Sequence, residues 1–410
     1  MASDWRQSTW GEEISLEYGK GIRGYKDAKG PYRVYGSNGP VGWTTKSLAD
    51  GPGVILGRKG AYRGVEYSKK PFFVIDTAYY VKPKNNHDMR WLYYAIQHYK
   101  LGEINDGSPI PSTTRAAVYV RDLNIPPLPE QRAIAHILGS LDDKIELNRR
   151  MNETLEAMAQ ALFKSWFIDF DPVIDNALAA GNVIPEELQP RAALRESLGD
   201  ARKPLPEEIH DLFPSEFDFT KEMGWIPRGW NITQIGEMLE LAYGKALAAK
   251  VREPGPYPVY GSGGIGGYHK EAIVEGPGII VGRKGTVGSV YWESDDFFPI
   301  DTVFFVKLKK NVPLYWVYQN LLQMDIASLG ADSAVPGVNR NSIYSKKWIL
   351  PSEQILSIYW MQLSPLTQKK WDLADQNRSL ESLRDTLLPK LLSGEIRIPE
   401  AEKLVEAVNS

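Results

Sequence analysis

The stretch Gly57-Arg58-Lys59-Gly60 recurs 225 residues further on as Gly282-Arg283-Lys284-Gly285. The flanking segments keep the same offset, since Ile75-Asp76-Thr77 returns as Ile300-Asp301-Thr302. Between residues 10–82 and 235–307, 31 of 73 positions are identical without a gap. Self-similarity at a fixed spacing is the sign of a repeated structural unit. The chain therefore contains two copies of one module, and the repeat decides its architecture.

Each copy is predicted to be rich in β-strands. Short apolar runs at 54–56, 72–75 and 78–81 are bounded by glycine and other turn residues, which is typical of strands. A pattern with helical spacing follows at 89–99, and residues 313–324 occupy the matching place in the second copy.

A different periodicity begins after Pro126-Pro127-Leu128-Pro129, where apolar residues recur in alternating steps of four and three. This spacing predicts a coiled-coil seam. The seam positions of the first helix are Ile134, Leu138, Leu141, Ile145, Asn148, Asn152, Leu155, Ala159, Leu162 and Trp166. Adding 225 gives a weaker second seam at Tyr359, Leu363, Leu366, Lys370, Leu373, Asn377, Leu380, Arg384, Leu387 and Leu391.

Two such helices in one chain are expected to pack together as an antiparallel coiled coil, each spanning roughly 50 Å at 1.5 Å per residue. An antiparallel pair that crosses at its midpoint places Asn148 beside Asn377. Buried asparagine pairs specify the register of coiled coils, so this contact is the test of the arrangement. The two modules would then be related by a pseudo-twofold axis.

The predicted fold class is α+β, with two tandem β-rich domains joined by two long helices and an internal repeat of offset 225. The predicted parts are the first module (1–129), a central spacer helix (130–168), an acidic connector containing prolines (169–224), the second module (225–351), a C-terminal spacer helix (352–392) and a tail (393–410).

Charge is unevenly distributed along the chain. The net charge is -3, which by itself argues against binding to a polyanion. The first module carries +6, the second +2 and the connector -8. Both modules are thus basic enough for modest attraction to phosphates, although many proteins that never touch DNA are equally basic.

Composition and motifs exclude several classes of function. The absence of cysteine excludes disulfides and thiolate metal sites and fits a reducing cytoplasm. The five histidines lack metal-ligand spacing, and we expect neither a membrane span nor a signal segment, because apolar runs of the necessary length are missing. Gly261-Ser262-Gly263-Gly264-Ile265-Gly266 fits a dinucleotide fingerprint, but strands follow it where that motif needs a helix. Neither a phosphate loop nor an adenine methyltransferase core occurs, so we expect a chain that is not itself an enzyme.

With these features the chain resembles the specificity subunits of type I restriction-modification systems. The resemblance extends over nearly all of the sequence and is carried by Pro227-Arg228-Gly229-Trp230, by the Pro-Leu-Pro-Glu-Gln-Arg run at 127–132 and by residues 387–394. It implies that each module is a target-recognition domain that reads half of a bipartite site in double-stranded DNA. It also implies that the helices act as a spacer and dock two methyltransferase subunits.

The resemblance further implies that cofactors belong to partners. S-adenosylmethionine is expected on the methyltransferase, which methylates adenine, and ATP and magnesium on an endonuclease and translocase subunit. Neither a cofactor nor a metal is expected on this chain.

The DNA-facing loops of the family fall on the repeated polar and glycine-rich segments. Glycines let the backbone approach phosphates, lysine and arginine neutralise them, and polar side chains can read base edges. The candidate contacts in the first module are Lys20, Tyr35, Ser37, Asn38, Arg58, Lys59, Ser108, Thr113 and Arg115. Those in the second are Lys245, Tyr260, Ser262, His269, Arg283, Lys284, Ser333, Asn339 and Arg340.

Simpler interpretations compete with each assignment. The repeated glycines can be turns between strands, and Asp76-Thr77 with Asp301-Thr302 can brace a loop or contact DNA. A protein-binding scaffold and a ligand-binding β protein remain as alternative functions. Glu130-Gln131 and Glu353-Gln354 are separated by 223 residues, which predicts a second module-to-helix linker that is shorter by two residues.

Overall fold

The computed structural model describes residues 4–104, 111–199, 205–330 and 337–409. Contacts divide the chain into two compact units. Unit 1 comprises Met1–Arg150 and Leu373–Ser410, and unit 2 comprises Met151–Asp372. Each unit therefore contains one module together with part of both long helices, so the compact units are not successive segments of the sequence. Within the described residues, no helix is sufficiently long and apolar to span a bilayer.

The first module is built from two small sheets and a strand pair. The four-stranded sheet has the order β2-β8-β5-β6, the three-stranded sheet the order β4-β3-β7, and β1 pairs with β9. All neighbours are antiparallel except β3 and β7. The strands are β1 (Arg6–Thr9), β2 (Ile14–Tyr18), β3 (Tyr32–Gly36), β4 (Gly39–Thr44), β5 (Gly53–Gly57), β6 (Val65–Ser68), β7 (Phe72–Val74), β8 (Ala78–Pro83) and β9 (Asp122–Ile125).

The second module repeats this topology. Its sheets have the orders β13-β19-β16-β17 and β15-β14-β18, and β12 pairs with β20. The register is kept as well, since Ile14 pairs with Pro83 and Leu239 with Leu308. The strands are β12 (Asn231–Gln234), β13 (Leu239–Tyr243), β14 (Tyr257–Gly261), β15 (Gly264–His269), β16 (Gly278–Gly282), β17 (Val290–Glu293), β18 (Phe298–Pro299), β19 (Val303–Leu308) and β20 (Lys347–Leu350).

Short helices cover each module at equivalent places. The apolar face of α2 (Met89–His98) is buried in the core of unit 1, and α9 (Leu314–Leu322) is its counterpart in unit 2. Both match the predicted helical segments. The other short helices of the modules are α1 (Trp10–Glu13), η1 (Leu101–Glu103), α3 (Arg115–Tyr119), α8 (Ile235–Met238), η4 (Ala249–Val251), η5 (Ala327–Gly330) and α10 (Arg340–Tyr344).

The two predicted spacer helices are continuous, as α4 (Leu128–Phe167) and α11 (Glu353–Ser393). In unit 1, Asn148 Nδ2 donates to Asn377 Oδ1 at 2.9 Å, and Arg384 Nη1 to Asp142 Oδ1 at 3.0 Å. Residue numbers thus fall on α4 as they rise on α11. The predicted antiparallel packing and the asparagine contact are both confirmed, and Asn148 is completely buried.

The seam of unit 2 follows the same direction. Phe163 and Tyr359 lie with ring centroids 6.4 Å apart, and the Lys370 ammonium pairs with the Glu156 carboxylate. The two charged seam positions therefore each have an acidic partner within their own unit, because Arg384 pairs with Asp142. Ala159, together with aromatic and leucine side chains, supplies further buried contacts of this seam.

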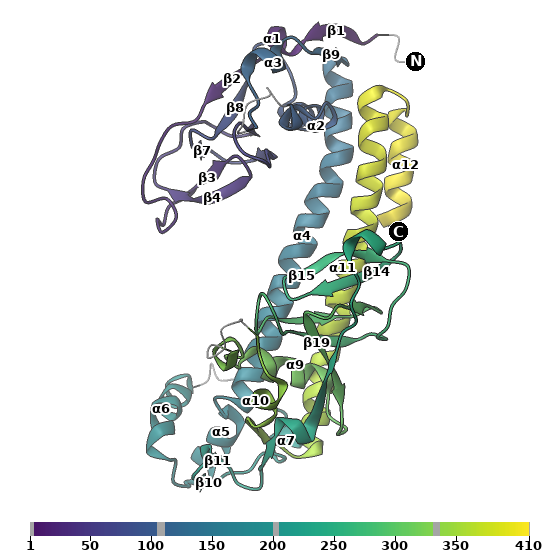
Figure 1. Cartoon of the computed structure of the whole chain (residues 1–410). Helices are drawn as coiled ribbons and strands as arrows, with labels where there is room; N and C mark the ends of the chain where they lie inside the picture. Colours follow the sequence, from purple (N-terminus) through teal and green to yellow (C-terminus); the bar gives the residue numbers. More distant parts are fainter. Residues whose placement is uncertain (1–3, 105–110, 200–204, 331–336, 410) are drawn as a thin grey trace. The chain divides into compact units, whose positions relative to one another are not determined.

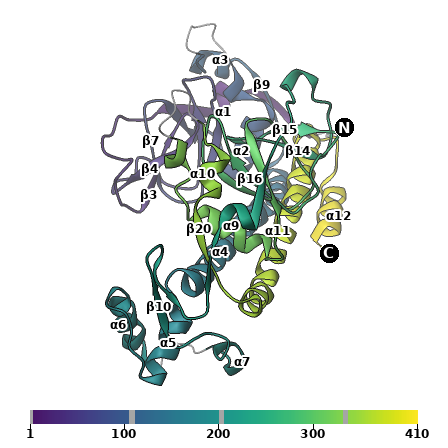
Figure 2. The same cartoon turned by 60° about the horizontal axis from the view of Figure 1, so that its bottom comes forward.

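The regions outside the repeat contain further helices and a hairpin. The expected tail contains a helix, α12 (Ile398–Asn409), which lies beside the C-terminal part of α11 in Figure 1. Ala401 of this helix is buried in the core of unit 1. The connector forms α5 (Asp171–Ala180), η2 (Glu186–Leu188), α6 (Gln189–Ser197), α7 (Glu207–His210) and the hairpin of β10 (Phe217–Thr220) and β11 (Gly224–Pro227). Figure 2 shows α5, α6 and β10 as one group.

The predicted difference between the two module-to-helix linkers is wrong. β9 ends at Ile125 and α4 begins at Leu128, whereas β20 ends at Leu350 and α11 begins at Glu353. Both linkers thus have the same length. The Glu-Gln pairs are not equivalent in structure, because Gln131 is buried and accepts a hydrogen bond from the Asp88 amide, while Gln354 is exposed.

Candidate nucleic-acid interface

The first module holds two arginine side chains against one exposed tyrosine ring. Tyr18 ends β2 and is 46% exposed. The guanidinium carbon of Arg58 lies 4.8 Å from the centre of its ring, and that of Arg115 lies 4.1 Å from it. The three residues come from segments far apart in sequence. Stacking on a ring is a favourable way to hold a guanidinium in a defined orientation.

The second module contains the same cluster at the same offset. Tyr243 is 49% exposed, with Arg283 at 4.8 Å and Arg340 at 5.1 Å from the centre of its ring. We call the two groups the Tyr18 cluster (Tyr18, Arg58, Arg115) and the Tyr243 cluster (Tyr243, Arg283, Arg340). Each presents two positive charges at a surface, which suits an anionic ligand.

Backbone hydrogen bonds hold the Gly-Arg-Lys-Gly loop in place. The amides of Arg58 and Lys59 both donate to Thr77 O, at 2.9 and 3.2 Å, and Arg58 Nη1 donates to Asp76 O at 3.1 Å. In the second module Arg283 makes the equivalent bonds to Thr302 O and Asp301 O, at 2.9 and 3.2 Å. The repeated Asp-Thr pair therefore braces this loop through its carbonyl groups, which supports one of the two interpretations left open by the sequence.

The loop is also tied to the segment that carries the second arginine. Thr113 N donates to Arg58 O at 2.9 Å, and Val338 N donates to Arg283 O at 3.0 Å. These bonds bring the segments before Arg115 and Arg340 against the loop. The convergence of both arginines on one ring is thus built into the backbone of each module.

The glycine of the repeated Tyr-Gly-Lys sequence is required by a close approach of two backbone segments. A Cβ atom on Gly19 would lie 2.0 Å from Ile75 O, and one on Gly244 would lie 2.2 Å from Ile300 O. No larger residue fits in either place without a backbone shift. This glycine lets the chain turn directly after the tyrosine and leaves the next residue, Lys20 or Lys245, exposed.

Several other predicted contacts are exposed near these segments. Lys20, Asn38, Lys59, Lys245, Lys284 and Asn339 are exposed, whereas Ser37, Ser262 and Tyr35 are half-buried. Ser37 Oγ donates to Thr77 O at 2.5 Å, and Ser262 Oγ accepts from the Thr286 amide at 3.3 Å. The Asn339 side chain accepts from the Asn341 amide and begins α10. These serine and asparagine side chains thus also stabilise the loops that bear the basic residues.

Three predicted contacts are corrected by their burial. Thr113 is completely buried and accepts a hydrogen bond from Arg63 Nε at 3.0 Å. Tyr260 is buried and donates to Glu293 Oε2 at 2.9 Å; burial and this carboxylate raise the pKa of Tyr260. His269 is buried, with Nδ1 accepting from the Glu253 amide at 3.0 Å. All three side chains support the fold from inside and are not part of the exposed surface.

Two further predicted contacts, Ser108 and Ser333, lie outside the described residues. The sequence-based set also omitted Tyr18 and Tyr243, which organise the clusters. Both tyrosines lie in a segment that repeats at the common offset. The signal was therefore present in the sequence, but the use of the ring as a platform for two distant arginines was not visible there.

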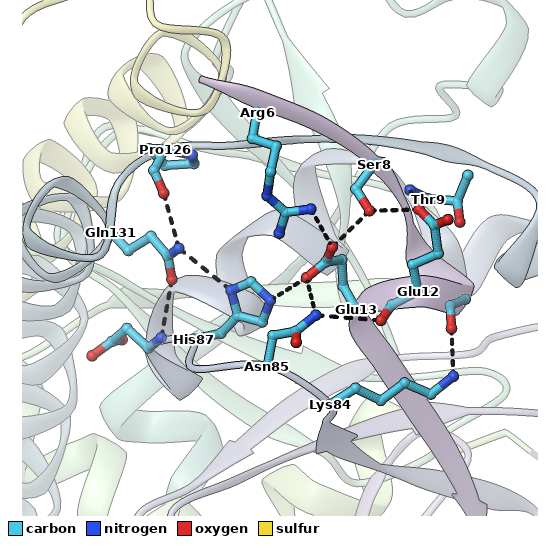
Figure 3. A network of polar contacts seen from close by, with 12 residues as sticks. Arg6, Ser8, Thr9, Glu12, Glu13, Lys84, Asn85, His87, Pro126 and Gln131 are labelled. Atoms are coloured by element: carbon cyan, nitrogen blue, oxygen red, sulfur yellow. Dashed lines mark hydrogen bonds and ion pairs between the residues drawn. The ribbon is translucent and has the colours of Figure 1, made fainter. Parts of the chain in front are cut away.

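A buried polar network supports the first module (Figure 3). The Glu13 carboxylate, almost completely buried, accepts from Arg6 at 2.8 Å and from Ser8 at 2.6 Å, and contacts His87 Nε2 at 2.7 Å. Burial raises the pKa of Glu13, but these hydrogen bonds outweigh it and hold that pKa well below its usual range. Gln131 at the start of α4 continues the network, with His87 Nδ1 3.4 Å from its Nε2.

Two central positions of this network are apolar in the second module. The positions of Glu13 and His87 are taken there by Met238 and Val312, both buried. Polar contacts attach each module to the seam in a second place: Tyr94 donates to Asp142 at 2.5 Å, and Tyr315 to Glu156 at 2.9 Å. The modules are thus anchored to the helices by different side chains.

The described residues contain no group of three or more histidine, aspartate or glutamate side chains arranged to hold a metal ion. The Gly261–Gly266 segment forms the turn between β14 and β15 and the start of β15. It therefore lacks the helix that a dinucleotide-binding loop leads into.

Comparison with known proteins agrees with the duplicated architecture. The family model of the type I restriction modification DNA specificity domain matches residues 29–157 and 227–379. Each match contains most of one module and a large part of the helix that follows it. Together the matches span well over half of the chain, and the chain therefore belongs to this family.

Individual relatives are specificity subunits. The HindI specificity subunit of Haemophilus influenzae is 29% identical over 345 residues, which covers 73% of this chain and 74% of that protein. The MjaIX specificity subunit of Methanocaldococcus jannaschii is 25% identical over 410 residues, covering 95% and 88%. The crystal structure of the S subunit of a type I system from M. genitalium has the same fold, with a TM-score of 0.58 at 19% identity and coverage of 95% and 96%.

Proposed function

We propose that each module binds one half of a bipartite target in double-stranded DNA. The observation that carries this proposal is the recurrence of two arginines on one exposed tyrosine, beside an exposed lysine, in both modules. Phosphate contacts fix a protein on the duplex and need cations at defined positions. Residues 21–29 and 246–254, which directly follow the repeated Tyr-Gly-Lys sequence, differ at every position between the modules, which would allow two different half-sites to be read.

The paired helices are proposed to set the spacing between the half-sites and to dock two methyltransferase subunits. Duplex DNA presents equivalent faces roughly 34 to 36 Å apart, one helical turn. Each helix has 40 or 41 residues, or roughly 60 Å at 1.5 Å per residue, and so is long enough to set such a spacing.

Catalysis is proposed to reside in partner subunits. Methyltransferase subunits would bind S-adenosylmethionine and methylate adenine, and an endonuclease and translocase subunit would use ATP and magnesium. The support from this chain is the lack of a phosphate loop or a methyltransferase core in its sequence. A cytoplasmic location stays a prediction, and the family match does not favour the scaffold or ligand-binding alternatives.

A map of methylated adenines tests the proposal directly. Cells that express this chain with its methyltransferase partner should carry methylation at a split motif, with two short half-sites separated by a fixed gap. Because the modules share so much of their sequence, the half-sites are expected to have bases in common when each is read from its own end. A contiguous motif, or an unmethylated genome despite a folded complex, would contradict the proposal.

Binding in vitro gives an independent test. The variant Arg58→Ala with Lys59→Ala should bind duplex DNA more weakly and with a shallower dependence on salt. The slope of log K against log salt should fall by about 0.9 for each phosphate that the variant no longer neutralises. The matched control is Lys100→Ala with Arg121→Ala, which removes two exposed cations elsewhere in the same module. Equal effects of the two double variants would count against a DNA site at the Gly-Arg-Lys-Gly loop.

A further inference from the structure

One acidic side chain distinguishes the two clusters. Glu17 lies next to Tyr18 in β2, and its Oε2 is 3.9 Å from Arg115 Nη2. Ser15 Oγ donates to Glu17 Oε1 at 2.6 Å and so helps to hold the carboxylate. In the second module Ala242 takes the position of Glu17. The Tyr18 cluster therefore has a carboxylate beside one arginine where the Tyr243 cluster has a methyl group.

The chemistry of the clusters favours a phosphate as their ligand. Two guanidinium groups against one ring repel each other, and an anion that contacts both removes this repulsion. Guanidinium groups match the geometry of phosphate oxygens. Because the ring already restricts the orientations of each arginine side chain, less conformational entropy is lost when phosphate binds. Here the ring is Tyr18 in one module and Tyr243 in the other.

The pattern of repetition points in the same direction. The clusters are retained in both modules, whereas residues 21–29 and 246–254, which directly follow the repeated Tyr-Gly-Lys sequence, differ at every position. Contacts to the sugar-phosphate backbone do not depend on the base sequence, so modules with different targets can share them. Base-reading residues are expected in segments that diverge.

We propose that the Tyr18 and Tyr243 clusters are phosphate clamps for the DNA backbone, and that Glu17 competes with phosphate for Arg115 and weakens the first clamp. The inference rests on the proposed function, because it assigns roles within the same DNA-binding surface. Partly exposed ion pairs are weak, so removal of the competing carboxylate should tighten binding by about threefold to fivefold. The second clamp, with Ala242, lacks this competitor.

The test uses the full chain and a fluorescein-labelled DNA duplex of random sequence, titrated at several salt concentrations. Glu17→Gln keeps the size of the side chain and removes its charge. It should tighten binding by about threefold to fivefold at low salt and steepen the salt dependence. The matched control is Glu103→Ala, which makes the same change in net charge at another exposed position of the first module.

Arginine variants test the asymmetry. Arg340→Ala should weaken binding more than Arg115→Ala, by about the factor gained in Glu17→Gln. In the Arg115→Ala background, Glu17→Gln should have no effect beyond that of Glu103→Ala. The losses should be the same on a second duplex of unrelated sequence, because a phosphate contact does not depend on the bases.

The outcomes separate this inference from the proposed function. A folded wild-type chain that binds no duplex at any salt concentration would refute DNA binding itself. Salt-dependent binding with equal effects of Glu17→Gln and Glu103→Ala would refute only the competition by Glu17. A loss in Arg115→Ala or Arg340→Ala that is confined to one DNA sequence would show that the cluster reads a base, and would overturn its assignment as a phosphate clamp.

Discussion

The asparagine contact between α4 and α11 gives a quantitative prediction about unit 1. Asn148 Nδ2 donates to Asn377 Oδ1 at 2.9 Å and to Gln376 Oε1 at 2.8 Å, and Asn148 is completely buried. Asn377→Leu removes one of the two acceptors and leaves the amide only partly satisfied. A buried polar group without its partner costs about 1 to 3 kcal/mol. We expect about 1.4 kcal/mol, which is a tenfold change in an equilibrium constant.

Replacement of both asparagines should be much less costly than the two single changes together. The variant Asn148→Leu with Asn377→Leu leaves no unsatisfied amide and adds apolar burial, so it should be close to the wild type in stability. The single variants and the double variant form a double-mutant cycle with a coupling energy of about 2.8 kcal/mol, because two losses of about 1.4 kcal/mol each are absent from the double variant. The leucine pair should also specify the register of α4 and α11 less strongly. A shifted register leaves buried amides without partners, whereas leucine side chains can pack against other apolar residues.

Hydrogen exchange of the α4 amides between residues 141 and 150 is the suitable assay, because it reports opening of this segment without requiring the whole chain to unfold in one step. Each single variant should exchange about tenfold faster there, and the double variant at nearly the wild-type rate. Ser140→Leu, at an exposed position of the same helix, is the control. Additive effects of the two single changes would refute the reasoning.

Three predictions concern ion pairs. Hydrogen bonds from Arg90, at 2.7 and 3.0 Å, lower the pKa of Asp143 to about 2, so this stabilisation is present above about pH 3.8 and is lost as the pH falls toward 2. Asp143 is partly exposed, and Asp143→Asn should cost only about 1 kcal/mol at neutral pH in thermal unfolding and remove that pH dependence. Glu13→Gln should cost about 1 to 3 kcal/mol, because it removes the charge of a buried acceptor that binds Arg6, Ser8 and His87; an unchanged urea midpoint would contradict this. Glu156→Gln, which loses the charge paired with Lys370, should cost about 1 to 3 kcal/mol, whereas exposed Glu153→Gln should be nearly neutral.

The prediction of the fold from the sequence succeeded where the information is periodic. The seam positions Leu138, Leu141 and Ile145 are buried as the spacing indicates. The comparison of two isolated Glu-Gln pairs at the ends of the repeat instead gave a wrong prediction, that of unequal linkers. Short identical dipeptides carry little information about structural equivalence, because burial of Gln131 depends on the module packed against it.

The candidate site was predicted only in part, for a different physical reason. Arg58, Arg115 and their counterparts were selected as basic residues in repeated segments. Tyr260 is also a repeated residue, since Tyr35 is its counterpart, yet it is buried. A residue can be repeated in both modules because it packs in the core or because it contacts a ligand at the surface. The sequence alone does not distinguish these two reasons.

The sequence alone determined the duplication, the two long helices and the Asn148–Asn377 register, because identities at a constant offset and apolar residues at regular steps are visible along one chain. The tertiary structure decided which polar residues reach the surface. It also decided that Arg58 and Arg115 meet on the ring of Tyr18. Such a meeting depends on backbone contacts between segments that are distant in sequence, and no local pattern encodes it.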